Sequence, residues 1–177
     1  MGTNYKNWMD VMVIKVTEKL PQPAEAQTTL TLPFELRQKS RLRATLDNGL
    51  EVGIMLSRGE VLRDGDCLRA ENGLVIRLKA AEEAVSTVAG SDTLLLQKAS
   101  YHLGNRHVPL QITQSGLCYL QDHVLDQMVE SLGLSIKHEM APFEPESGAY
   151  QQHAHSQAHS QSHSHVHNDG HHHHSHD

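Results

Sequence analysis

Cysteine is scarce in this 177-residue chain, aromatic residues make up only 4% of it, and long apolar runs are missing. The two cysteines, Cys67 and Cys118, stand far apart and outside any paired-cysteine motif. This pattern excludes a cysteine-based zinc module and a disulfide framework, and it is typical of a reducing compartment. No stretch approaches the roughly 20 apolar residues that a membrane span needs, and Asp10 and Lys15 interrupt the only N-terminal run that resembles a signal core. We therefore expect a cytoplasmic protein without a membrane partner.

Basic charge is also in short supply. Lysine and arginine together number 15 against 21 aspartates and glutamates, which gives a formal net charge of −6. A nucleic-acid-binding protein would show a basic patch or stripe, so we expect no nucleic-acid partner. Because aromatic residues are few, the core must be largely aliphatic. One or two domains are expected, since domains most often run to about 100–150 residues.

Residues 1–80 have the pattern of a small all-β domain. Polar and apolar residues alternate with a period of two in 41–46, which is typical of a half-buried strand. The Asn-Gly signals at 47–49 and 71–73 each predict a hairpin. The predicted strands cover 11–16, 30–32, 41–46, 51–56, 66–70 and 74–78. This half contains no histidine, no glycine-rich phosphate loop and no Ser/His/Asp set, so we expect a structural or protein-docking domain of the sandwich or barrel-like kind.

Residues 81–150 have the pattern of a β-α-β-β-α-β domain. Ser91 or Asp92 is placed to cap a helix that runs to Leu103, and Asp122 is placed to cap a second helix that Gly133 ends. Strands are predicted at 84–88, 108–113, 117–121 and 134–137. Six elements in this order describe a ferredoxin-like split β-α-β fold, so the predicted fold class of the chain is α+β.

The connection between the first of these helices and the next strand presents a histidine. Gly104 is predicted to follow the helix in a left-handed conformation. Pro109 biases Val108 toward extended backbone, so the chain should continue as a strand. His107 is then held at both ends and can be aimed at a ligand. A lone histidine at such a junction is more often a hydrogen-bonded surface residue than a metal ligand, so the pattern alone leaves both interpretations open.

Three more histidines lie in this half. If the two middle strands form a tight hairpin, His107 lies beside His123 at the end of the sheet away from the turn. Asp122, next to His123, is placed to orient an imidazole. His102 is predicted to be a packed helix residue, and His138 a solvated strand residue.

Residues 151–177 differ sharply in composition from the rest of the chain. They have no periodic apolar face and hold eleven of the fifteen histidines, so we expect a disordered metal-binding tail. The candidate ligands of the tail are His153, His155, His159, His163, His165, His167, His171, His172, His173, His174 and His176. A purification tag is the alternative, but a tag is usually one uninterrupted run, and these histidines are interleaved with other residues. Imidazole suits nickel, zinc and copper, and binding should weaken below about pH 6.5, where imidazole becomes protonated.

Three segments, together with the histidine-rich end, resemble one known family. They are 101–112, with a Gly-Asn-Arg-His run between helix and strand, 122–128, and 142–150, which reads Pro-Phe-Glu-Pro-Glu-Ser-Gly-Ala-Tyr. They are similar to the UreE family of urease accessory proteins, and the resemblance extends over the whole chain. It implies a homodimeric, cytoplasmic nickel metallochaperone that delivers Ni²⁺ for assembly of the urease metallocentre. The implied partners are the urease apoprotein complex and its GTPase accessory protein.

The same resemblance has implications for the fold and the site. The N-terminal domain should be similar to the peptide-binding domain of Hsp40-type chaperones, and the C-terminal domain should be ferredoxin-like. His107 should lie at the dimer interface, where copies from two subunits share one ion, with His153, His155 or water completing the site. His123 matches a further metal-binding histidine of some members. The family can also carry histidine where this chain has Gln121, and this departure puts a full accessory site in doubt.

Two other functions compete with that of a nickel carrier. A storage protein would buffer Ni²⁺, Zn²⁺ or Cu²⁺ through the tail alone. A metalloenzyme would place His107, His123 and Asp122 around zinc, but the chain has no evident general base and no His-Glu-x-x-His helix. We therefore expect no enzymatic activity and Ni²⁺ as the cargo, with Zn²⁺ or Cu²⁺ also able to bind.

Overall fold

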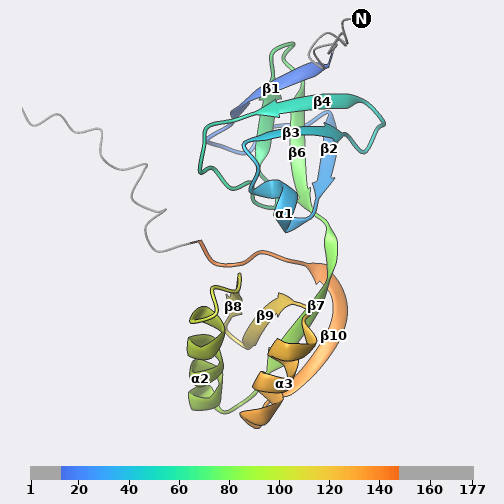
Figure 1. Cartoon of the computed structure of the whole chain (residues 1–177). Helices are drawn as coiled ribbons and strands as arrows, with labels where there is room; N and C mark the ends of the chain where they lie inside the picture. The colour runs from blue at the N-terminus through green and yellow to red at the C-terminus, as the bar shows by residue number, and fades with distance from the viewer. Residues whose placement is uncertain (1–12, 148–177) are drawn as a thin grey trace, which may run out of the picture. The chain divides into compact units, whose positions relative to one another are not determined.

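The computed structural model describes residues 13–147, which form two sheets and three helices (Figure 1). The described residues up to Glu146 belong to one compact unit. The predicted tail at 151–177 and the first two residues of the strand predicted at 11–16 lie outside the described residues. No helix in the described part of the chain is long and apolar enough to cross a membrane.

The first sheet has six strands in the order β2-β6-β5-β1-β4-β3. The strands are β1 (Ile14–Lys19), β2 (Thr28–Leu32), β3 (Arg41–Thr45), β4 (Glu51–Met55), β5 (Cys67–Ala70) and β6 (Val75–Ala80). The pairs β1–β4 and β2–β6 are parallel, and the other neighbours are antiparallel. Both predicted hairpins are confirmed, with Gly49 and Gly73 in the left-handed conformation that their turns require. The core of this sheet is aliphatic, as expected, and includes Val16, Leu30, Val52, Ile54, Leu68, Ile76 and Leu78.

A short helix between β2 and β3 escaped prediction. It is α1 (Phe34–Arg37), a single turn that follows Pro33. One turn is too short to show a helical period in the sequence. Its last residue, Arg37, is completely buried, which is unusual for an arginine unless the charge is paired.

The second sheet has four strands in the order β10-β7-β9-β8, and every neighbouring pair is antiparallel. Its elements in chain order are β7 (Glu82–Ala89), α2 (Thr93–Gly104), β8 (Gln111–Thr113), β9 (Gly116–Leu120), α3 (His123–Ser131) and β10 (Ser135–Pro142). The predicted order of six elements is therefore observed. Ala99 and Leu103 of α2 share one core with Val129 of α3 and Tyr119 of β9, so both helices pack on the same face of the sheet.

Local signals placed both helices well. The Asp92 carboxylate accepts hydrogen bonds from Leu94 N and Leu95 N at 2.9 and 3.1 Å, which confirms the predicted cap of α2. The Asp122 carboxylate caps α3 in the same way. Strand bounds were less accurate: β7 and β10 are longer than predicted, and β8 begins at Gln111 instead of residue 108.

Candidate metal site

His107 lies in the connection between α2 and β8, and its side chain is exposed. Its φ is 57°, and no other non-glycine residue has a positive φ in the described part of the chain. The prediction that Gly104 takes the left-handed position is wrong. Asn105 N still donates to Tyr101 O at 3.0 Å, so Gly104 is the last residue of the helix. The left-handed position therefore falls on the histidine three residues later.

The helix side of this connection is fixed by its own backbone. His107 N donates to Gly104 O at 2.9 Å, and Arg106 N donates to Leu103 O at 3.0 Å. A non-glycine residue in the left-handed region costs on the order of 1–3 kcal/mol and persists only where the surroundings hold it. Such strain collects at functional sites, so this backbone supports the prediction that His107 acts on a ligand.

The strand side is fixed by a segment that follows β10. We call residues 143–146 the strap. Glu146 N donates to Leu110 O, and Glu144 N donates to the Gln111 side-chain oxygen, both at 2.8 Å. The connection that carries His107 is thus held at both ends, as predicted, although the strand-side support comes from the strap and not from an early start of β8.

His123 and Asp122 lie at the start of α3. His123 is the first residue of the helix and is exposed. The Asp122 carboxylate accepts from Val124 N and Leu125 N at 2.8 and 3.1 Å, so its role as a helix cap is established, and its second role, orienting an imidazole, stays a prediction.

The tight hairpin from which His107 was placed beside His123 is observed, but the juxtaposition of the two histidines stays a prediction. The β8–β9 ladder joins only the pairs from Gln111–Cys118 to Thr113–Gly116 and does not reach either histidine. Between residues 13 and 147, no group of three or more His, Cys, Asp or Glu side chains is close enough to hold a metal ion. Metal binding at His107 and at His123 stays a prediction. An ion at either histidine would need further ligands from outside residues 13–147 of the same chain or from water.

His138 is exposed in strand β10, as the sequence predicted, and its ring also contacts a carboxylate. Its Nε2 lies 2.9 Å from Asp126 Oδ2, and the Tyr119 hydroxyl donates to Asp126 Oδ1 at 2.8 Å. Ser86 pairs with both Tyr119 and His138 across three neighbouring strands. Asp126 of α3 therefore lies over the row formed by Tyr119, Ser86 and His138, and its hydrogen bonds hold the helix on the sheet.

Burial and hydrogen bonding act in opposite directions on this carboxylate. Burial raises the pKa of Asp126, but Ser86, Tyr119 and His138 together lower it further, so it lies below the usual 3.8. Ser86 Oγ is buried and completes no hydrogen bond of normal geometry within the described residues, so we assign the lowering mainly to the other two groups. Burial, followed by the bond to Asp126, raises the pKa of Tyr119.

Exposed apolar side chains flank the His107 connection along the chain. Leu94 and Tyr101 of α2 are 58% and 66% exposed, and Ile112 of the edge strand β8 is 50% exposed. Leu94 and Tyr101 are seven residues apart and share one side of the helix, whereas Ala99 and Leu103 face the core. This second apolar side was not predicted from the sequence, although three consecutive leucines at 94–96 span too wide an arc of a helix to face one core.

Comparison with known proteins identifies the family. The N-terminal domain model of the UreE urease accessory proteins matches residues 13–81, and the C-terminal domain model matches residues 83–177. Proteins with the name urease accessory protein UreE are similar over most of their length. The Alkalilimnicola ehrlichii protein is 65% identical over 138 residues, 78% of this chain and 85% of its own. The Tolumonas auensis protein is 54% identical, over 80% of this chain and 78% of its own, and a Pseudomonas putida protein is 53% identical, over 81% and 90%. The chain therefore belongs to the UreE family of urease accessory proteins.

Proposed function

We propose that this protein is a nickel metallochaperone that binds Ni²⁺ through His107 and delivers it to the urease apoprotein, together with a GTPase accessory protein. The observation that carries the proposal is the backbone of His107, which holds an exposed imidazole in a left-handed conformation between two fixed ends. Membership of a urease accessory family supports a role in urease maturation and a carrier in place of an enzyme. We place the protein in the cytoplasm.

The proposal includes a homodimer in which two copies of His107 share one ion. One imidazole is too few for a nickel site, and the described residues of one chain form no group of three or more His, Cys, Asp or Glu side chains that could hold the ion. Leu94, Tyr101 and Ile112 give the same part of the chain exposed apolar surface, which is what an interface between copies requires. A two-fold axis near His107 would bring the two imidazoles together.

The remaining ligands in the proposal come from the tail histidines, such as His153 and His155, or from water. Imidazole binds Ni²⁺, Zn²⁺ and Cu²⁺, so the latter two ions should also bind. His123 is proposed as a weaker, incomplete site, because Gln121 stands where the resemblance allows a second histidine.

The finer description of the fold is also part of the proposal. The strand order β10-β7-β9-β8 with α2 and α3 on one face supports a ferredoxin-like C-terminal domain at 81–150. The six-stranded sheet supports an N-terminal domain at 1–80 similar to the peptide-binding domain of Hsp40-type chaperones. The tail at 151–177 is the third part.

Ni²⁺ titration with molecular mass followed in parallel tests the proposal. The proteins to compare are the intact chain, His107→Ala, and a full-length form whose eleven tail histidines are replaced by serine. We expect the serine-tailed form to keep one tight ion per dimer and His107→Ala to lose that ion while its weaker tail sites still fill. Tight binding that survives His107→Ala would refute the proposed role of His107.

A storage protein is the second candidate, favoured by the eleven histidines between residues 151 and 177. A pure buffer should lose nearly all of its nickel when those histidines become serine, and it should not support urease activation. A carrier should retain part of its urease activation in the serine-tailed form. Urease activity in cells that carry each variant decides between the two.

A further inference from the structure

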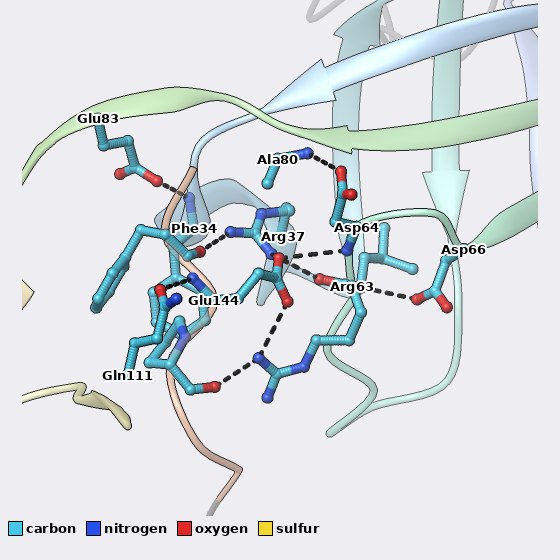
Figure 2. A network of polar contacts seen from close by, with 12 residues as sticks. Phe34, Arg37, Arg63, Asp64, Asp66, Ala80, Glu83, Gln111 and Glu144 are labelled. Atoms are coloured by element: carbon cyan, nitrogen blue, oxygen red, sulfur yellow. Dashed lines mark hydrogen bonds and ion pairs between the residues drawn. The ribbon is translucent and has the colours of Figure 1, made fainter. Parts of the chain in front are cut away.

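The strap that supports the His107 connection is itself held by Arg37 of α1 and by Arg63, which lies between β4 and β5. Arg37 Nη1 pairs with the Glu144 carboxylate, and Arg37 Nη2 donates to Phe143 O (Figure 2). Arg63 Nη1 donates to Pro145 O at 2.6 Å and lies 3.4 Å from the other Glu144 oxygen. Glu146 N donates to Leu110 O. Each of the four strap residues is therefore bound by a residue from another part of the chain.

Burial makes the Arg37–Glu144 pair selective. Arg37 is 0% exposed, and Glu144 supplies the only carboxylate that contacts it among the described residues. The Asp64 backbone N–H, at 3.2 Å, adds a further donor to Glu144. A buried guanidinium needs a charged partner, so Arg37 holds the strap in one place and loses its partner if the strap moves.

The strap residues that Arg37 and Arg63 hold also bond to the connection that carries His107. The same Glu144 whose carboxylate pairs with Arg37 donates its backbone N–H to the Gln111 side chain at 2.8 Å. Two residues on, Glu146 N bonds to Leu110 O. His107 stands three residues before Leu110 in a backbone conformation that needs both of its ends fixed.

We infer that Arg37 and Glu144 are positioning residues for metal binding: through the strap, they hold His107 in the conformation that presents its imidazole to the ion. The inference rests on the proposed function, because it requires His107 to be a ligand. It makes helix α1, through Arg37, a part of the metal site's support.

Nickel affinity in the full-length protein tests the inference. Glu144→Gln and Arg37→Met remove the buried ion pair, and Gln111→Ala removes only the acceptor on the connection, which keeps the test valid if either buried variant folds poorly. Arg43→Met and Glu51→Gln are matched controls, because these residues form an exposed ion pair between β3 and β4 that does not contact the strap. Asp126→Asn is a control for stability, since it loosens α3 without touching the strap.

We expect the strap variants to bind the tightest Ni²⁺ about tenfold more weakly, within the range of usual coupling between sites, with the number of weaker sites unchanged. The two matched controls and Asp126→Asn should keep the wild-type affinity, because loss of stability alone does not move a ligand. Wild-type affinity in all three strap variants, with tight binding lost in His107→Ala, would overturn the inference and leave the proposed function intact. Tight binding unaffected by His107→Ala would overturn both.

Discussion

A left-handed backbone is unfavourable for any residue that carries a Cβ atom, and His107 adopts it on an exposed connection. Glycine would adopt this backbone without strain. The histidine therefore lowers the stability of the fold in return for an imidazole at this position. We predict that His107→Gly unfolds less readily than His107→Ala, by about 1 kcal/mol in the free energy of unfolding. Urea denaturation of the two metal-free variants measures the difference.

Both variants lack the imidazole, so the comparison separates backbone strain from metal binding. Neither should bind the tightest Ni²⁺. An alanine variant as stable as the glycine variant would show that residue 107 is not held in the left-handed region.

The Asp126 carboxylate makes the stability of the fold depend on pH. Its pKa lies below 3.8 in the folded protein, so the ionised carboxylate stabilises the fold above that pH, and this stabilisation is lost as the pH falls through the folded pKa. We predict that wild type is more stable than Asp126→Asn at pH 6 and that the difference shrinks as the pH falls below about 4. Denaturant unfolding across this range measures it. The opposite trend, a difference that grows as the pH falls, would show that the carboxylate is not stabilised by Tyr119 and His138.

Most of the secondary-structure elements that were predicted correctly carried a local signal. The Asn-Gly hairpins, both aspartate caps and the stop at Gly133 each depend on a few adjacent residues, and each is observed. Contacts between distant residues left no such signal. Arg37 meets Glu144 across 107 residues of sequence, and His138 meets Asp126 only because β10 returns beneath α3.

At the end of α2, the sequence pattern predicted a left-handed backbone for Gly104, and this prediction was wrong. The structure places it inside the last turn of α2, with open space where a Cβ atom would lie. We predict that Gly104→Ala raises the free energy of unfolding by about 0.5–1 kcal/mol, because alanine is the better helix residue. Gly133→Ala is the matched control: its site is equally open, but its φ is +90°, so this variant should be destabilised. If Gly104→Ala is destabilised, residue 104 has the left-handed backbone that the sequence predicted. Thermal or urea unfolding of the two variants distinguishes these results.

On the scale of the whole molecule, the proposed shared ion requires two chains to meet near His107, and α2 offers the surface for it. Leu94 is 58% exposed on the side of α2 that faces away from the core. We predict that Leu94→Arg separates the dimer, because a charge then replaces an apolar side chain on the surface of α2 that we propose meets the partner copy. Val124→Arg is the control, since Val124 is equally exposed, at 57%, but stands on α3.

Light scattering coupled to size-exclusion chromatography, with and without Ni²⁺, measures the outcome. Leu94→Arg should run as a monomer and bind the His107-dependent ion weakly, because each chain then offers one imidazole where the ion needs two. Val124→Arg should remain a dimer with wild-type affinity. If Leu94→Arg stays dimeric while Val124→Arg dissociates, the copies meet through α3, and two His107 side chains cannot share the ion in the way proposed.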